Sequence, residues 1–374
     1  MASKNSAAEA MTLPASTKPQ RNAVRRPLNG LKGFLRQIVA ATVATSLAAG
    51  SFAQSAPPSL ASPASMPTAS ASTPTTKPDP EKVIFRLATD VLPAGSVQLS
   101  GGVTVNIGDW PALAIAQIPV GSALASCTAT FVGPTVMLTA AHCVDAAFSS
   151  KPRELWVEVD GRKLQFNCTI SPAYLEHPPQ ITSPRGSEDY ALCIWRGKES
   201  LPPSLKALTN EVVEVSQPLL TGDKVLMVGY GCTDLKVVND EFTWSPSDKT
   251  LRIGDQQVEK APKYDPAQPA YARVRSSLGQ EPALCPGDSG GPIFSGATTA
   301  APQAKRRIRA VNSSINMEKA TGGYDILSFV SSTSSITFNN WAREWLKDET
   351  KLKPAIAPTI CGVNKKAGDY PCRQ

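Results

Sequence analysis

The chain has 374 residues, of which 41% are hydrophobic and 18% are charged, so most of it is expected to be folded rather than disordered. Its net charge of +7 is concentrated in residues 1–53, where seven Lys or Arg residues and one Glu give +6 and leave +1 for the rest. This nearly neutral remainder gives no indication of a strongly basic surface, so we expect no nucleic-acid partner.

Residues 1–53 have the features of a signal peptide. A basic stretch ends at Arg36, an apolar run follows from Ile38 to Ala49, and small residues flank Phe52, which is the pattern that a signal peptidase cleaves. The apolar run is too short to cross a bilayer. We therefore expect a secreted, periplasmic or extracellular protein with no stable membrane span after signal cleavage. An uncleaved anchor is the alternative.

Residues 54–98 are predicted to be a linker or a pro-segment. Seven of the 27 residues in 54–80 are proline and none is aromatic. Such a segment cannot bury enough apolar surface to offset its ordering entropy, so we expect it to be extended.

A β-rich region is predicted from about residue 99 onward. Short apolar runs alternate there with Gly, Pro, Asn and Asp, as at 136–138, 155–159, 225–228 and 308–311. Many short strands with turn signals between them predict an all-β barrel or sandwich.

A helix is predicted near the end of this region, at about 335–349, followed by a cysteine-containing tail at 351–374. The helix is indicated by apolar residues at helical spacing, namely Phe338, Trp341, Trp345 and Leu346.

The cysteines favour disulfides over a metal site. The chain has eight cysteines and only two histidines, His142 and His177, and no two cysteines are spaced as CxxC. A zinc cluster needs such ligands close together, whereas an even number of cysteines in an exported protein is typical of disulfides. We expect no metal and no cofactor, and we assign no role to His177.

Two segments contain residues suited to acid–base chemistry. His142 follows the predicted strand at 136–138 and precedes Cys143, and a bridge to Cys127 would stiffen the turn that holds the imidazole. A general base needs such fixing. Asp189 precedes small and apolar residues, a position from which a carboxylate could fix the tautomer of a histidine. Taken alone, His142 could be a structural histidine and Asp189 could be an ordinary turn former.

The third segment, Cys285-Pro286-Gly287-Asp288-Ser289-Gly290-Gly291-Pro292, is more specific. Glycines on both sides of Ser289 let the backbone approach a ligand closely. The backbone N–H groups of Gly287 and Ser289 could point together at a developing oxyanion.

Together the three segments resemble the chymotrypsin/trypsin-like serine peptidase family, in TAAHC at 139–143, DYALC at 189–193 and GDSGGP at 287–292. The resemblance covers about 99–349 and keeps the family's order of His, Asp and Ser. It implies two antiparallel six-stranded β-barrels with a C-terminal helix. The peptidase domain would span 99–350, with the first barrel at about 99–215 and the second at about 216–334.

The resemblance also implies roles for these residues in cleaving protein or peptide substrates, following the family's well-known triad. Ser289 would attack the scissile carbonyl, His142 would act as the base and Asp189 would orient it. Gly287 and Ser289 would form the oxyanion hole. The alternative functions are an esterase using the same groups, and a non-catalytic binding or adhesion protein that keeps the fold.

Activation by cleavage is implied by Leu99-Ser100-Gly101-Gly102, which looks like the mature start of family members. Cleavage after Gln98 would free an ammonium group at Leu99, which could pair with Asp288 and shape the oxyanion hole. Leu99 departs from the usual Ile or Val, and Gln98 is not a basic cleavage site.

Substrate preference follows from the same comparison. Ala283 occupies the position where trypsin-type members place an acid at the base of the specificity pocket. Ser313 would match the serine near the aspartate, and Ile315 would narrow the pocket mouth. We expect a small or medium apolar residue before the cleaved bond, with Asp325 as an acid that could still reach the pocket.

The family pattern implies the disulfide Cys127–Cys143. The other pairings are expected to be Cys168–Cys193, Cys232–Cys285 and Cys361–Cys372, with the third beside the active site and the last closing a loop in the tail.

Overall fold

The structure is a computed structural model that describes residues 99–179, 183–352 and 357–374. The predicted signal peptide and the whole of the predicted linker therefore lie outside the described residues. No helix among these residues is long and apolar enough to cross a membrane.

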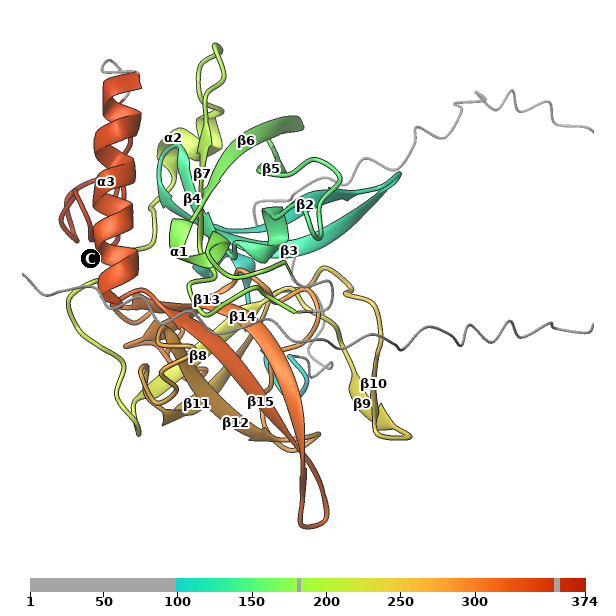
Figure 1. Cartoon of the computed structure of the whole chain (residues 1–374). Helices are drawn as coiled ribbons and strands as arrows, with labels where there is room; N and C mark the ends of the chain where they lie inside the picture. The colour runs from blue at the N-terminus through green and yellow to red at the C-terminus, as the bar shows by residue number, and fades with distance from the viewer. Residues whose placement is uncertain (1–98, 180–182, 353–356) are drawn as a thin grey trace, which may run out of the picture. The chain divides into compact units, whose positions relative to one another are not determined.

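Six antiparallel strands form the first barrel, in the upper part of Figure 1. In order around the barrel they are β2 (Leu113–Val120), β3 (Ala123–Gly133), β4 (Val136–Thr139), β7 (Ala191–Trp195), β6 (Arg162–Ile170) and β5 (Glu154–Val159). In β5 every second residue is buried, as expected for a strand with one face toward a core. Asp160 and Gly161 both have positive φ and make the tight turn that joins β5 to β6.

Six further strands close the second barrel, because β8 pairs with both β11 and β13. Around this barrel the order is β8 (Lys224–Gly229), β11 (Arg252–Lys260), β12 (Tyr271–Ser277), β15 (Gly323–Ser332), β14 (Arg307–Ala320) and β13 (Pro292–Ser295). The chain therefore has the predicted pair of six-stranded barrels, and the strands predicted at 136–138, 155–159, 225–228 and 308–311 lie within β4, β5, β8 and β14.

The start of the described chain belongs to the second barrel, not to the first as the sequence led us to expect. Strand β1 (Val103–Thr104) pairs with β11, and Ser100 forms a β-bridge with Ala283. The reason is that the strand edges able to accept residues 99–104 are contributed by segments far along the chain, which local sequence does not reveal.

Smaller elements lie outside the barrels. The hairpin of β9 (Leu235–Val238) and β10 (Glu241–Trp244) forms a separate two-stranded sheet. Two short helices, α1 (Pro172–Leu175) and α2 (Pro203–Ala207), lie in connections. The 3-10 turns span Ile107–Asp109 and His142–Val144.

The C-terminal helix, α3 (Ile336–Leu352), confirms the predicted helix and extends it by one turn. Its four predicted apolar residues are all buried. Phe338 packs edge-on against Tyr190, with ring centroids 4.9 Å apart, and Trp345 Nε1 donates a hydrogen bond to Thr169 Oγ1 at 3.1 Å. The helix that follows the second barrel is thus packed on the first (Figure 1).

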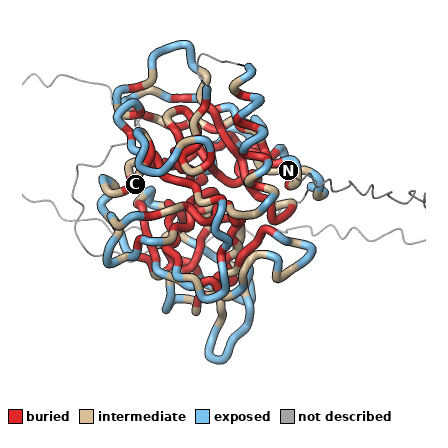
Figure 2. Tube along the Cα trace, turned by 90° about the vertical axis from the view of Figure 1, so that its left-hand side faces the viewer, coloured by how far each residue is buried: buried red, intermediate tan, exposed pale blue. Residues whose placement is uncertain are grey.

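The tail docks on the segment that connects the two barrels. Val213 N donates to Cys361 O at 2.9 Å, Asn210 N donates to Pro371 O at 2.8 Å, and Cys361 N donates to Val132 O at 2.7 Å. Cys361 and Cys372 are 0% and 5% exposed, so part of the tail belongs to the interior. Figure 2 shows the buried residues gathered inside the domain, with exposed residues in the loops around it.

Four disulfides are present, and they are the four expected pairs: Cys127–Cys143, Cys168–Cys193, Cys232–Cys285 and Cys361–Cys372. Two of them lie within the first barrel, one links the segment after β8 to the segment before Ser289, and one closes the tail.

Candidate active site

His142 and Asp189 meet because their strands are neighbours. His142 begins the turn after β4 and Asp189 lies just before β7, and the two strands pair with Thr139 opposite Ala191. Asp189 Oδ1 accepts the backbone N–H of His142 at 2.8 Å, and its Oδ2 lies 2.7 Å from His142 Nδ1. Because a carboxylate only accepts, Nδ1 carries the hydrogen. Nε2 is left as the acceptor.

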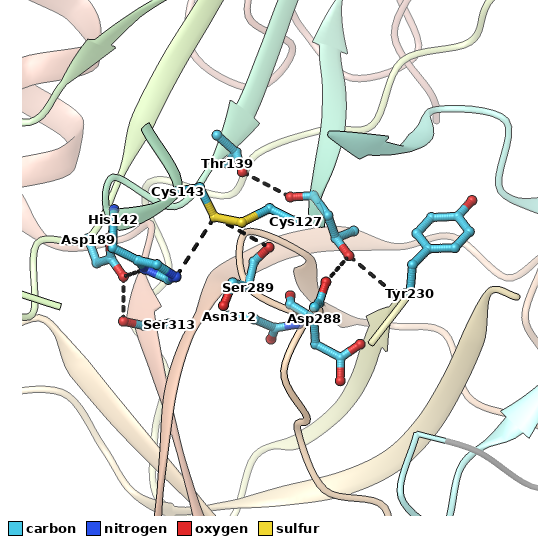
Figure 3. Close-up of a disulfide and its surroundings, with 12 residues drawn as sticks. Cys127, Thr139, His142, Cys143, Asp189, Tyr230, Asp288, Ser289, Asn312 and Ser313 are labelled. Carbon is cyan, nitrogen blue, oxygen red and sulfur yellow. Dashed lines mark hydrogen bonds and ion pairs between the residues drawn. A yellow bond between two sulfur atoms is a disulfide. The ribbon is translucent and has the colours of Figure 1, made fainter. Parts of the chain in front are cut away.

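The second barrel completes the environment of Asp189, which is fully buried. Ser313 Oγ donates to Asp189 Oδ2 at 2.6 Å, so Asp189 lies between His142 and Ser313 (Figure 3). Tyr271 OH lies 2.9 Å from Ser313 Oγ and donates to it, because the hydrogen of Ser313 is already used. Burial, reinforced by the charge of Asp189, raises the pKa of Tyr271 and keeps it a donor.

Ser289 lies in a loop that is fastened to the first barrel and to β14. Ser289 O accepts the N–H of Thr128 at 2.7 Å, and Gly290 N donates to Asn312 O at 2.8 Å. The hydroxyl of Ser289 makes no hydrogen bond with the ring of His142 among the interactions of the described residues, although both side chains line the same cleft. The structure therefore joins His142, Asp189 and Ser313 directly and places Ser289 nearby.

The backbone N–H groups of Gly287 and Ser289 have no hydrogen-bond partner among the described residues. The φ of Gly287 is +105°, a conformation that L side chains rarely adopt. Thr128 Oγ1 donates to Gly287 O at 3.0 Å and holds this peptide in place. Two unoccupied donors beside a serine could receive an oxyanion.

Asp288 is 1% exposed, although it is among the residues that line the cleft. Its carboxylate accepts the N–H groups of Gly231 at 2.7 Å and Cys285 at 2.8 Å. Burial raises its pKa to about 7, against the opposing effect of these two donors and of the charge of Arg252. Asp288 forms no ion pair with any described residue.

Leu99 is 2% exposed and packs in the apolar interior of the second barrel, in one cluster with Met227 and Leu284. Ala283 N donates to Ser100 O at 3.0 Å and fixes this segment. No contact joins Leu99 to Asp288 within the described structure.

The cleft between the barrels has a volume of about 970 Å³ and is lined by residues of both. Of the predicted site residues, it contains His142, Gly287, Asp288, Ser289, Ser313 and Ile315. Ala283 lies deeper and is fully buried, in one apolar cluster with the Cys232–Cys285 bridge and Ile326, against which Ile315 packs.

Asp325 does not reach the cleft. Its Oδ2 accepts a hydrogen bond from Arg275 Nη1 at 2.9 Å on the neighbouring strand β12. The alternative that Asp325 supplies a free acid for the pocket was therefore wrong.

His177 is also placed by the structure. Its Nε2 lies 3.7 Å from Glu188 Oε2, and its side chain is one-third exposed. The cluster of His142 with Cys127 and Cys143 is no metal site, because the two sulfurs are bonded to each other.

Three residues around the His142–Asp189 pair were not predicted from the sequence: Tyr271, Asp145 and Arg185. Tyr271 lies 82 residues from Asp189 in sequence, and no local pattern links them. Asp145 and Arg185 form an ion pair with a shortest distance of 2.6 Å. Opposite charges near two predicted site segments were the only available signal.

The family model described as Trypsin matches residues 99–341, which is more than half of the chain. No curated protein matches the chain significantly.

Proposed function

The chain belongs to the trypsin family of serine peptidases, and from this premise we propose that it is an exported serine endopeptidase that acts through Ser289, His142 and Asp189. The observation that carries the proposal is the pair of hydrogen bonds between His142 and fully buried Asp189, completed by Ser313. This arrangement leaves Nε2 of His142 as an acceptor, in the same cleft as a serine hydroxyl.

In the proposed reaction, Ser289 Oγ attacks the carbonyl carbon of the substrate while His142 Nε2 takes the hydroxyl proton. The negative charge that forms on the carbonyl oxygen is met by the N–H groups of Gly287 and Ser289. The C–N bond then breaks as His142 returns the proton to the leaving amine. Water attacks the resulting ester in the same way and releases Ser289. Buried Asp189 stabilises the imidazolium in both steps.

The contact between Ser289 and His142 is expected to form when a substrate binds, because catalytic hydrogen bonds often tighten only in the complex.

Replacement of the nucleophile is the first test. Ser289→Ala should lower kcat for peptide hydrolysis by about 10⁶-fold and abolish labelling by a fluorophosphonate, whereas exposed Ser200→Ala should leave both unchanged. Labelling that persists in Ser289→Ala would contradict the proposal. A wild-type protein that binds peptides without labelling would favour the non-catalytic alternative, and cleavage of esters alone would favour an esterase.

We propose that the enzyme prefers substrates with a small or medium apolar residue before the cleaved bond. Fully buried Ala283 provides no carboxylate, Ile315 packs against the same cluster, and Asp325 is paired with Arg275. A buried Lys or Arg side chain would lack a partner there. The test is to measure which peptide bonds the wild-type protein cleaves in a peptide library. Dominant cleavage after Lys or Arg would contradict the preference.

We further propose that the protein is made as a zymogen and activated by cleavage between Gln98 and Leu99. Leu99 is already buried in the second barrel, and Asp288 is a buried carboxylate without an ion-pair partner among the described residues. An ammonium group at Leu99 would supply that partner, and a buried pair of this kind acts as a switch because neither charge is stable there alone.

A further inference from the structure

A partly buried ion pair connects the segment of His142 to the segment of Asp189. Asp145 follows the turn that begins with His142, and its backbone N–H donates to His142 O at 3.3 Å. Its carboxylate is 2% exposed and accepts two hydrogen bonds from Arg185, from Nε at 2.6 Å and from Nη2 at 2.8 Å. Arg185 lies four residues before Asp189.

Asp145 also begins the turn that brings Phe148 into contact with the imidazole ring of His142. The N–H groups of Phe148 and Ser149 donate to Asp145 O, at 3.0 and 2.9 Å, so the turn of 145–149 is built on Asp145. This turn places the ring of Phe148 edge-on against His142, with ring centroids 5.6 Å apart and planes at 67°. The imidazole is therefore held by Asp189 at Nδ1 and by Phe148 beside the ring.

We propose that Asp145 and Arg185 are a positioning pair that fixes the geometry of His142 against Asp189. The inference rests on the proposed function. One ion pair joins the turn that presents Phe148 to the segment that presents Asp189, so these two contacts on the imidazole share one anchor.

The character of the ion pair suits this role. A guanidinium that binds one carboxylate through two parallel N–H groups fixes direction as well as distance. Burial opposes the charge of Asp145, but the hydrogen bonds and charge of Arg185, with the N–H groups of Ala147 and Ala146, outweigh it and lower the pKa of Asp145. The pair is therefore charged at neutral pH.

Other contacts keep both segments attached if the pair is removed. Ser149 Oγ donates to Pro119 O at 3.0 Å and ties the far end of the turn to β2. Ser187 Oγ accepts the N–H of Ala270 at 3.1 Å and ties the Arg185 segment to the second barrel. Variants of the pair are thus expected to fold with a misplaced imidazole. A displacement of about 1 Å at a catalytic group can lower the rate by about 10²-fold.

The test compares Arg185→Met, Arg185→Lys and Asp145→Asn with wild type on one peptide substrate. All rates are normalised to active sites titrated with a fluorophosphonate, so that loss of folded protein does not count. We expect kcat to fall about 10- to 100-fold in Arg185→Met and Asp145→Asn with KM little changed. Arg185→Lys should show a smaller loss, since lysine keeps the charge without the fork.

The dependence of kcat/KM on pH distinguishes a role in positioning His142 against Asp189 from a purely structural role. A less firmly held Asp189 stabilises the imidazolium less, so the acid limb of kcat/KM should move to lower pH in Arg185→Met. The other titratable groups around Asp189 are unchanged in the variants: Glu188, His177, Tyr174, Tyr190 and Tyr271. Arg162→Met, which removes the exposed ion pair with Glu199, is the matched control and should match wild type.

The outcomes are distinguishable. A wild-type protein that neither labels nor hydrolyses peptides overturns the proposed function and this inference with it. An active wild type whose Arg185 and Asp145 variants keep kcat per titrated site and the same acid limb overturns the inference alone. If Arg185→Met fails to fold, Arg185→Lys decides, because an unchanged kcat and pH profile there also overturns it.

Discussion

At the scale of single residues, Asp288 is the group whose protonation the fold changes most clearly. A carboxyl group usually titrates near 3.8, but burial raises the pKa of Asp288 to about 7. Between these two pH values the uncut folded chain holds a proton that the unfolded chain has released. The free energy of unfolding therefore receives its full contribution from Asp288 below pH 3.8 and loses it as the pH rises toward 7.

We predict that uncut protein carrying Ser289→Ala, which prevents self-cleavage, loses about 4 kcal/mol of stability from this group between pH 4 and 7. When Asp288→Asn is added, the free energy of unfolding should change less between pH 4 and 7, because an amide does not titrate. Urea unfolding at several pH values measures the effect. Glu241→Gln, at an exposed carboxylate, is the control. An equally steep decline in the Asp288→Asn protein would contradict the prediction.

At the residue scale, candidate site residues could be predicted where a short motif contains them. Ser289, Gly287 and Asp288 could be named as candidates because their spacing is local. Ser313 was found through the family resemblance. Tyr271, Asp145 and Arg185 were not found, because their roles come from contacts that only the folded barrels create. The Arg275 partner of Asp325 is a further case, since strand pairing brings those two residues together.

At the scale of elements, the docked tail is the feature that the sequence described least well. Its cysteines predicted a small closed loop, but not that this loop would hydrogen-bond to residues 210–213 between the barrels. Strands and α3 were predictable because apolar periodicity marks them. Tail residues such as Ile360, Cys361 and Cys372 are buried without any periodic pattern.

We predict that replacing both cysteines of the tail, Cys361→Ser with Cys372→Ser, lowers the free energy of unfolding by about 3 kcal/mol, the size expected for a loop of this length. Thermal unfolding of the Ser289→Ala background measures the change as a fall in Tm. The same comparison after reduction with a thiol is the control, since both proteins should then unfold alike at the tail. An unchanged Tm under oxidising conditions would show that the tail adds no stability.

At the scale of the whole molecule, the site depends on both barrels at once. His142 and Asp189 come from the first, while Ser289, Ser313 and Tyr271 come from the second. Hydrogen bonds such as Thr128 N to Ser289 O hold the two together. The number of barrels and the assignment of each catalytic segment followed from the family resemblance. The attachment of residues 99–104 to the second barrel did not, because it depends on strand pairing across about 150 residues.

For the maturation of the whole chain, we predict that mass spectrometry of the secreted active protein finds Leu99 as its first residue. The reason is that a new ammonium group at this buried position would neutralise Asp288 and stabilise the loop of Gly287. A fully active form that retains residues 90–98 would contradict this. Blocking the cut with Gln98→Pro should leave the protein folded and far less reactive toward a fluorophosphonate.

Because the tail is synthesised last, its hydrogen bonds to the segment between the barrels can form only late in synthesis. The backbone groups of Asn210 and Val213 bond to Pro371 and Cys361, which a ribosome reaches only about 150 residues later. At about 5–20 residues per second, this delay is on the order of 10 seconds. During that interval the backbone groups of Asn210 and Val213 that later bond to the tail can bond only to water, so a polypeptide interrupted before residue 361 would carry all the proposed catalytic groups and still lack these contacts.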